Sequence, residues 1–211
     1  HAITDSSITV LEGEQVEVTI PVLKLKEVPL KFEFSNVPAG YDPAELNASI
    51  SPATIRIAGT ADTVDGIESV NAGFINLARV QLGKAETLKI QLSEGLVNVD
   101  DVQEATVTFD TSGYGEPRAI TVSDIRVVNA PSGVDVKVIT ESINNVTLVG
   151  EAEELAAISP SDVIAQVDAS AQNITVKRSG QQQFSAQIIV TGTKTVFATG
   201  AYSVLCDITV K

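Results

Sequence analysis

The sequence has almost none of the side chains that enzymes most often use for acid–base and metal chemistry. Its 211 residues include one histidine, at position 1, one cysteine, and no methionine or tryptophan. A single terminal histidine leaves no internal His-based general base and no His-rich metal site. A single cysteine excludes an internal disulfide and any zinc or redox motif built from paired cysteines. We therefore predict a protein that is not an enzyme, with no catalytic, cofactor-binding or metal-binding residues.

Positive charge is also scarce. The chain has 14 basic and 27 acidic residues, and its formal net charge is −13. Such a charge repels nucleic acid and anionic lipid surfaces, so neither is expected as the main partner. No stretch approaches the roughly 18 apolar residues that a membrane helix needs, and no basic-then-apolar signal segment opens the chain. We interpret the chain as a soluble portion of a longer protein, with His1 as a tag remnant.

The dominant pattern is alternation of apolar and polar residues, which is typical of strands with one buried face. Hydrophobic residues make up 44% of the chain, enough for a core. Strands are predicted at 16–22, 30–34, 55–57, 88–92, 105–109, 184–190 and 202–210. Helical patterning is limited to short stretches at 43–46, 61–67 and 151–158. The predicted fold class is mainly β, with short helical connectors.

An internal repeat divides the chain into two similar halves. The segment Asn-Val-Pro-Ala-Gly-Tyr-Asp at 36–42 reappears as Asn-Ala-Pro-Ser-Gly-Val-Asp at 129–135, 93 residues later. The apolar strand and glycine at 55–59 match 146–150, and Ile67 matches Ile158, both 91 residues later. One two-residue deletion in a loop accounts for the change in spacing. Pro and Gly in the first segment favour a sharp turn.

The repeat predicts two homologous β domains arranged end to end. We assign residues 1–13 to an N-terminal extension or the end of a preceding unit, 14–112 to the first repeat and 119–211 to the second. The Gly-, Ser- and Pro-containing stretch at 113–118 is the predicted linker. Because it is short, the two units are expected to have little freedom relative to each other.

Carboxylates are the most numerous candidates for a site. Asp100, Asp101 and Glu104, and separately Asp62 and Asp65, could bind Ca²⁺ through hard oxygen ligands. Neither group has the Asp-x-Asp-x-Asp-Gly loop of a calcium site, and we prefer the interpretation that they form a solvated acidic surface. An enzyme that uses carboxylates alone is kept as a further alternative.

The single cysteine and the three tyrosines are the other side chains of interest. Cys206 is in phase with the apolar residues of the strand at 202–210, which predicts a buried, unreactive thiol. Tyr41 lies in the predicted turn and Tyr114 in the predicted linker, while Tyr202 starts the last strand. Tyr41 and Tyr114 are either exposed interface anchors or packed against the neighbouring unit, and we prefer packing.

The order of these segments resembles the YbbR-like repeat. In the first unit the resemblance rests on 51–59, on 64–67 and on 72–77; in the second it rests on 143–150, on 154–158 and on 163–168. Closing strands at 104–110 and 202–210 finish the units, so the resemblance covers residues 14–211. The second unit has Asn144 and Asn145 where the first has Pro52, and Asp168 where the first has Leu77.

The resemblance implies a non-enzymatic module outside the cytoplasm of a bacterium. It implies a membrane or envelope location, with attachment only through a membrane helix that this sequence does not contain. It further implies a protein partner, with a membrane diadenylate cyclase, which makes cyclic di-AMP, as the candidate that the module would regulate or scaffold. A structural or adhesive envelope spacer is the alternative. No binding residue of the family can be carried over to a position here, and the oligomeric state is left open.

Overall fold

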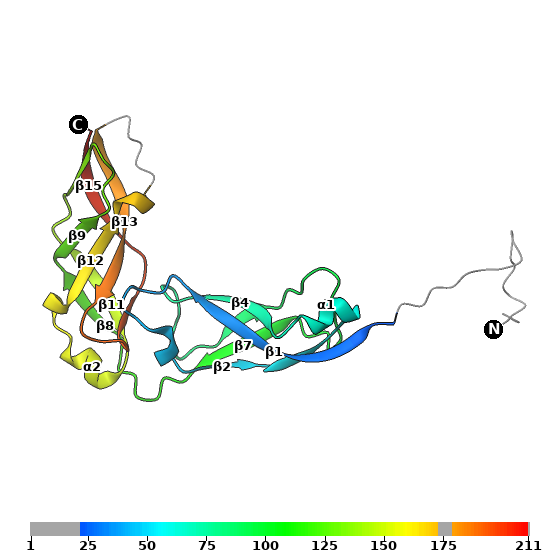
Figure 1. Cartoon of the computed structure of the whole chain (residues 1–211). Helices are drawn as coiled ribbons and strands as arrows, with labels where there is room; N and C mark the ends of the chain where they lie inside the picture. Colours follow the sequence, from blue (N-terminus) through cyan, green and yellow to red (C-terminus); the bar gives the residue numbers. More distant parts are fainter. Residues whose placement is uncertain (1–21, 173–178, 211) are drawn as a thin grey trace, which may run out of the picture.

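The computed structural model describes residues 22–172 and 179–210, and most of these form short β-strands (Figure 1). The first group of strands is β1 (Lys24–Ser35), β2 (Ala48–Ser51), β3 (Thr54–Gly59), β4 (Val70–Asn76), β5 (Glu86–Lys89), β6 (Val97–Asn98) and β7 (Glu104–Phe109). The second group is β8 (Arg118–Val122), β9 (Asp124–Val128), β10 (Val134–Val138), β11 (Ile143–Val149), β12 (Val163–Asp168), β13 (Gly180–Val190), β14 (Phe197–Thr199) and β15 (Tyr202–Val210).

Helices are few and short. The α-helices are α1 (Ala61–Asp65) and α2 (Ala152–Ala157), and the 3₁₀ turns are Pro43–Glu45, Pro160–Asp162 and Ala169–Ala171. Within residues 22–172 and 179–210, no helix has the length and apolar character that crossing a bilayer requires. The mainly β class with short helical connectors is confirmed.

The strands form four sheets, and no sheet contains strands of both groups. The first group makes the sheets β4-β1-β3-β6 and β2-β7-β5, and the second group makes β10-β15-β13-β12-β9 and β14-β11-β8. We call β1–β7 the first unit and β8–β15 the second unit. The two units meet at a bend, and the second stands at one end of the first (Figure 1).

The strand pairings of the first unit recur in the second. The start of β1 pairs antiparallel with β3 and its end pairs parallel with β4. In the second unit β8 and β9 divide these two roles, with β8 antiparallel to β11 and β9 parallel to β12. The pairs β3–β6, β2–β7 and β5–β7 correspond to β11–β14, β10–β15 and β13–β15. The repeat found in the sequence is therefore also a repeat of topology.

One matched contact aligns the two units residue by residue. Lys26 Nζ donates to the carbonyl oxygen of Ile67 at 2.6 Å, just after α1. Arg118 Nη1 donates to the carbonyl oxygen of Ile158 at 2.8 Å, just after α2. A cation at the carbonyl end of a helix satisfies groups that the helix leaves unpaired. Lys26 and Arg118 pair across the strand with Ile57 and Leu148, which are themselves repeat equivalents.

Each unit has its own apolar core between its sheets. Val28, Ile57 and Ala105 are among the buried residues that join the two sheets of the first unit. Phe184 and Cys206 lie in the larger core of the second unit, both with 0% exposure. The alternation that predicted these strands is the reason for the arrangement, since every second side chain of a strand faces the same side.

Most of the predicted elements are present, with differences at their ends. The strand predicted at 88–92 is confirmed only in part, because β5 ends at Lys89. The helices predicted at 61–67 and 151–158 are one or two residues shorter at an end. Residues 16–21 of the first predicted strand and residues 1–13 lie outside the described residues, and Val22 is outside any strand.

Candidate functional site: the junction between the two units

A third apolar cluster crosses from one unit to the other. Phe197 of β14 and Val149 of β11 belong to the second unit, yet they pack in one cluster with Tyr41, Leu77 and Phe109 of the first. Phe197 and Leu77 both have 0% exposure. Burial of apolar side chains contributes on the order of 1.5–3 kcal/mol each. The junction is therefore a core in its own right.

An aromatic pair lies at the centre of this cluster. The rings of Tyr41 and Phe197 have centroids 4.4 Å apart and planes tilted by 46°. Tyr41 follows the Pro38–Gly40 turn, which directs it out of the first unit's sheets and towards the second unit. Of the two interpretations of Tyr41, packing against the neighbouring unit is thus confirmed.

Tyr114 of the linker is the second tyrosine at this cluster. It is half-buried and packs against the same apolar side chains. The hydroxyls of Tyr41 and Tyr114 are both buried and lack a hydrogen bond of acceptable geometry within the described part of the chain. Burial raises the pKa of the Tyr41 phenol far above its usual range, and the neighbouring Tyr114 adds to that rise. Burial also raises the pKa of Tyr114.

Backbone hydrogen bonds fix the orientation of the units around this cluster. The amide of Gly200 donates to the carbonyl oxygen of Ala78 across the junction at 2.6 Å. In the linker, the amide of Gly115 donates to Gly150 at 3.0 Å and the amide of Ala152 donates to Gly113 at 2.9 Å. These bonds hold the chain that joins the units against the start of α2. The predicted linker is thus part of the second unit's structure, and β8 begins at its last residue, Arg118.

Glycine is required at position 150 by a close backbone approach. A Cβ atom there would lie 2.5 Å from the carbonyl oxygen of Thr195 and 2.7 Å from the Cα atom of Val196. Those residues lead directly into β14 and Phe197. The glycine therefore lets the junction-forming strand lie against the end of β11. The sequence predicted only that this glycine ends a strand.

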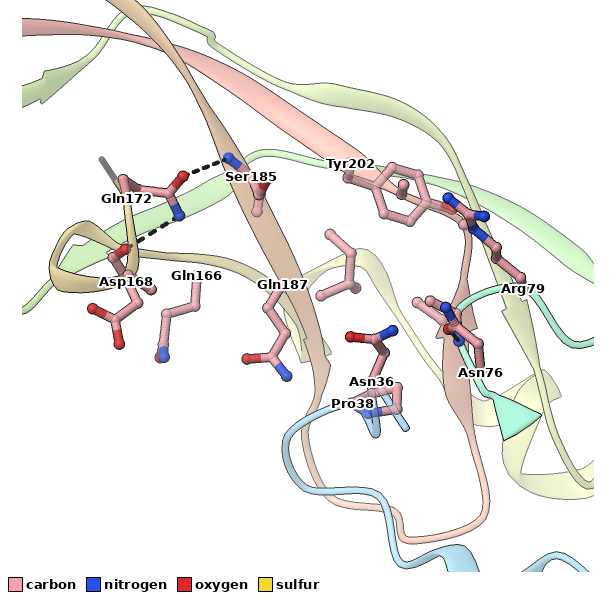
Figure 2. Close-up of a pocket in the computed structure, with 17 residues that line it drawn as sticks. Asn36, Pro38, Asn76, Arg79, Gln166, Asp168, Gln172, Ser185, Gln187 and Tyr202 are labelled. Carbon is pink, nitrogen blue, oxygen red and sulfur yellow. Dashed lines mark hydrogen bonds between the residues drawn. The ribbon is translucent and has the colours of Figure 1, made fainter. Parts of the chain in front are cut away.

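A cleft opens beside the junction core, between the two units (Figure 2). It has a volume of about 420 Å³. Asn36 and Pro38 of the first unit face Gln166 and Gln187 of the second, and Arg79 lies at one end of the row (Figure 2). The side-chain amide of Gln187 donates to the carbonyl oxygen of Val37 at 3.4 Å, a weak contact across the cleft.

The cleft has a polar, amide-rich wall. Amide side chains supply both donors and acceptors, so such a wall suits a polar ligand or a protein backbone. Asp168 is the only carboxylate among the described lining residues, and it already accepts hydrogen bonds from neighbouring side chains. It accepts from Ser170 at 2.7 Å and from Asn129 at 3.0 Å, which lowers its pKa. The cleft thus lacks the second carboxylate that glycoside hydrolysis requires.

Three of the five acidic residues singled out in the sequence have structural partners. Asp100 accepts from Arg56 Nε at 2.7 Å and from the Arg56 backbone amide at 2.7 Å, and these bonds lower its pKa. Asp65 pairs with Lys24, and Asp101 accepts from Gln103 at 2.8 Å. Within residues 22–172 and 179–210 no group of three potential metal ligands is found.

The remaining predicted residues lie away from the junction core or support it indirectly. Cys206 is fully buried on β15, as predicted, and burial raises the pKa of its thiol. Tyr202 lines the cleft, where its hydroxyl donates to the carbonyl oxygen of Thr199 at 2.6 Å. It also accepts from the amide of Thr147 at 2.9 Å, which ties β15 to β11.

Phe197 and Val149 were missed as junction residues. Val149 was assigned only to the strand that the glycine ends, and Phe197 lies outside the alternating runs. The one available signal was the low aromatic content of 4%. Because large rings contribute much buried area, each of the few in this chain is a candidate for a buried contact. Their partner Tyr41 is distant in the sequence, so no local pattern links them.

The fold and the junction define a class of protein: a tandem-repeat β protein whose two units share one apolar interface. Residues 28–123 match the family described as YbbR-like protein. This segment runs from β1 to the end of β8, and over it the resemblance to the YbbR-like repeat that the sequence predicts is confirmed. No curated protein matches the chain.

Two solved structures are similar to the chain at low identity. A crystal structure of a YbbR-like protein from Streptococcus pneumoniae TIGR4 is 17% identical, and the match covers 94% of this chain and 99% of that one, with a TM-score of 0.33. The solution structure of SuR18C from Streptococcus thermophilus is 20% identical over 43% of this chain and 89% of that one, with a TM-score of 0.34.

Proposed function

We propose that the chain is a non-catalytic interaction module, outside the cytoplasm, of a membrane-anchored bacterial protein. The observation that carries this proposal is the shared apolar core of Tyr41 and Phe197, which holds two β units in one orientation. A module that acts by contact needs surfaces whose relative position is fixed, because each free rotation between them costs binding free energy. The junction supplies that fixed geometry.

The partner we propose is a membrane diadenylate cyclase, which the module would regulate or scaffold through protein–protein contact. Support for this partner comes from the YbbR-like resemblance. The test is co-expression of the membrane-anchored protein that contains this chain with the cyclase, followed by measurement of cyclic di-AMP and of co-purification. We expect an altered nucleotide level and a retained complex. Unchanged nucleotide together with no co-purification would refute the regulatory role.

A matched pair of variants makes this experiment sharper. Phe197→Ala removes a junction side chain, whereas Phe184→Ala removes an equally buried ring that lies inside the second unit. If fixed orientation is what the partner recognises, Phe197→Ala changes the nucleotide level more than Phe184→Ala at equal protein abundance. Equal effects of the two variants would show that overall stability, and not the junction, matters.

A rigid envelope spacer is the second candidate, and the same junction supports it. A spacer sets distance without binding the cyclase. It predicts that nucleotide levels stay constant in both variants, while the reach of the anchored protein changes when a unit is removed. The cyclase assay therefore separates the two candidates.

A further inference from the structure

Arg79 lies at one end of the polar cleft between the two units (Figure 2). Its guanidinium group makes no hydrogen bond or ion pair within residues 22–172 and 179–210. The other arginines in this part of the chain are engaged: Arg56 and Arg126 form ion pairs with aspartates, and Arg118 donates to carbonyl oxygens at the end of α2. Arg79 is therefore the described arginine whose positive charge remains free for a ligand.

The backbone holds Arg79 in a fixed place at this end of the cleft. The amide of Arg79 donates to the carbonyl oxygen of Asn76 at 3.0 Å, and Asn76 Oδ1 accepts from the amide of Ala78 at 3.0 Å. Ala78 in turn accepts from the amide of Gly200 in the second unit, and Leu77 is fully buried in the junction core. An ordered backbone reduces the conformational entropy that a ligand contact must offset.

The floor of the cleft is the outer face of the β12–β13 pair. Gln166 and Gln187 are opposite each other in the register of these strands, where Cβ atoms lie about 4.5–5.5 Å apart. Both face away from the core, because the adjacent residues Ala165 and Ile188 are buried in it. Gln166 makes no side-chain hydrogen bond within the described residues, and Gln187 makes only the weak contact across the cleft. The two amides thus have donors and acceptors to spare.

Asn36 supplies the opposite wall, and its repeat equivalent shows that its side chain is free. The equivalent residue is Asn129, and both have a positive φ, of 50° and 55°. Asn129 donates to Asp168 at the end of β12. The side chain of Asn36 makes no hydrogen bond within the described part of the chain, although Asn76 ends β4 in the same way. Asn36 faces the second unit across the cleft instead (Figure 2).

The ends and the lining of the cleft favour a peptide over a saccharide. Arg79 and Asp168 lie at opposite ends, which gives the cleft a positive and a negative end (Figure 2). Tyr202 is the aromatic residue among the described lining residues, and its hydroxyl is bonded to Thr199. Its ring lies against Gly200, where a Cβ atom would be 2.9 Å from the ring Cζ. The described lining therefore lacks an open aromatic face on which a sugar ring could stack.

We propose that this cleft binds a short extended peptide, with a carboxylate of the peptide at Arg79 and its backbone along Gln166 and Gln187. The planar guanidinium fork matches the two oxygens of a carboxylate. A glutamine side chain can donate to a peptide carbonyl and accept from a peptide amide at the same time. The volume of about 420 Å³ lies within the range of about 300–1,000 Å³ that is usual for ligand pockets. This proposal does not rest on the cyclase as the partner.

The direct test is selection of synthetic hexapeptides on the immobilised full chain. One library of random sequences carries a free C-terminal carboxylate and the other a C-terminal amide. Bound peptides are identified by mass spectrometry, and isothermal titration calorimetry measures their Kd. We expect Arg79→Gln to weaken the selected peptides about tenfold or more, because a charge-assisted bidentate contact is lost. Binders from the amide library that contain Asp or Glu place a side-chain carboxylate at position 79, whereas binders from the free-acid library alone place the C-terminus there.

Matched variants show whether the peptide occupies the cleft. Lys89→Gln removes the same charge from an exposed site on β5 and should leave the Kd unchanged. Arg79→Lys keeps the charge but loses the fork, so it should weaken binding less than Arg79→Gln. Gln187→Ala should weaken binding several-fold, whereas Gln181→Ala, at an exposed position of β13 outside the cleft, should not. Thermal melts by circular dichroism confirm that each variant is folded.

Nuclear magnetic resonance locates the peptide without any substitution. The side-chain amide signals of Gln166 and Gln187 should shift when a selected peptide is added, and those of Gln181 should stay in place. Chitotetraose, added as a saccharide probe, should leave all three unchanged. No enriched peptide, selected peptides that bind folded Arg79→Gln as tightly as wild type, or amide shifts with chitotetraose alone would each overturn the proposal.

Discussion

Replacement of Phe197 by alanine should separate the two units without unfolding either. Phe197 and Phe184 are both fully buried in the second unit. Truncation of a buried phenylalanine to alanine costs about 3–5 kcal/mol through lost apolar burial and the cavity left behind. The two variants should therefore lose similar amounts of unfolding free energy. They differ in what surrounds the ring, since only Phe197 contacts the first unit through Tyr41.

A double-mutant cycle with Tyr41→Ala isolates the contribution of the junction. Aromatic pairs of this kind contribute about 0.5–1.5 kcal/mol beyond their buried area. We expect a coupling free energy in that range between positions 41 and 197. Between positions 41 and 184 the coupling should be close to zero, because those side chains lie in different cores. Guanidinium unfolding followed by circular dichroism supplies the four free energies of each cycle.

Orientation provides an independent measurement. In the wild type, residual dipolar couplings from both units should fit one alignment tensor, and the Gly200 amide should exchange slowly because it donates to Ala78. Phe197→Ala should require two tensors and speed Gly200 exchange, whereas Phe184→Ala should leave one tensor. A single tensor for Phe197→Ala, with no coupling to Tyr41, would refute the view that this ring holds the units together.

Three further predictions concern protonation and close packing. Because the pKa of Tyr41 is raised in the folded state, the free energy of unfolding is unaffected below the unfolded-state pKa near 10 and falls above it. Tyr41→Phe should reduce this alkaline loss by up to about 1.4 kcal/mol per pH unit. The measurement is the difference in unfolding free energy between the variant and the wild type from about pH 9 to about pH 11. The pKa of Asp100 is lowered by Arg56, so its contribution is present above the unfolded-state value and is lost as pH falls through the folded one. Asp100→Asn should therefore show a smaller loss of stability than wild type in acid titrations below about pH 4. Gly150→Ala should destabilise the second unit by about 1–3 kcal/mol in thermal melts, and more than Gly59→Ala destabilises the first, because the nearest backbone atom lies at 2.5 Å in one case and 3.0 Å in the other.

The elements that the sequence predicted well are those whose signal is local. Cys206 was placed correctly because alternation along nine residues of one strand fixes which face it occupies. The short helices were placed because glycine and acidic residues mark their ends. The repeat was visible because turn residues such as Pro38 and Pro131 keep their order and spacing.

The junction could not be predicted in this way because its parts are distant in the chain. β14 has only three residues, too few for a period to be detected, and it begins with Phe197. Whether Tyr41 faces solvent or a neighbouring unit depends on how the two units meet, which no local pattern contains. The polar cleft beside the junction is also formed by residues of both units, so the sequence could not predict which amide side chains line it.

The two units share chemistry at some equivalent positions and differ at others. Positions that hold each unit's own fold carry similar chemistry, as with Lys26 and Arg118 at the helix ends. Equivalent positions differ where only one of them meets a neighbouring unit: Val97 of β6 is exposed, whereas Phe197 of β14 is buried at the junction. Valine buries less apolar area than phenylalanine, which lowers the stabilisation by about 1–2 kcal/mol where the side chain is fully covered. The phenylalanine on β14 therefore holds the second unit on the first more firmly than a valine would at that position.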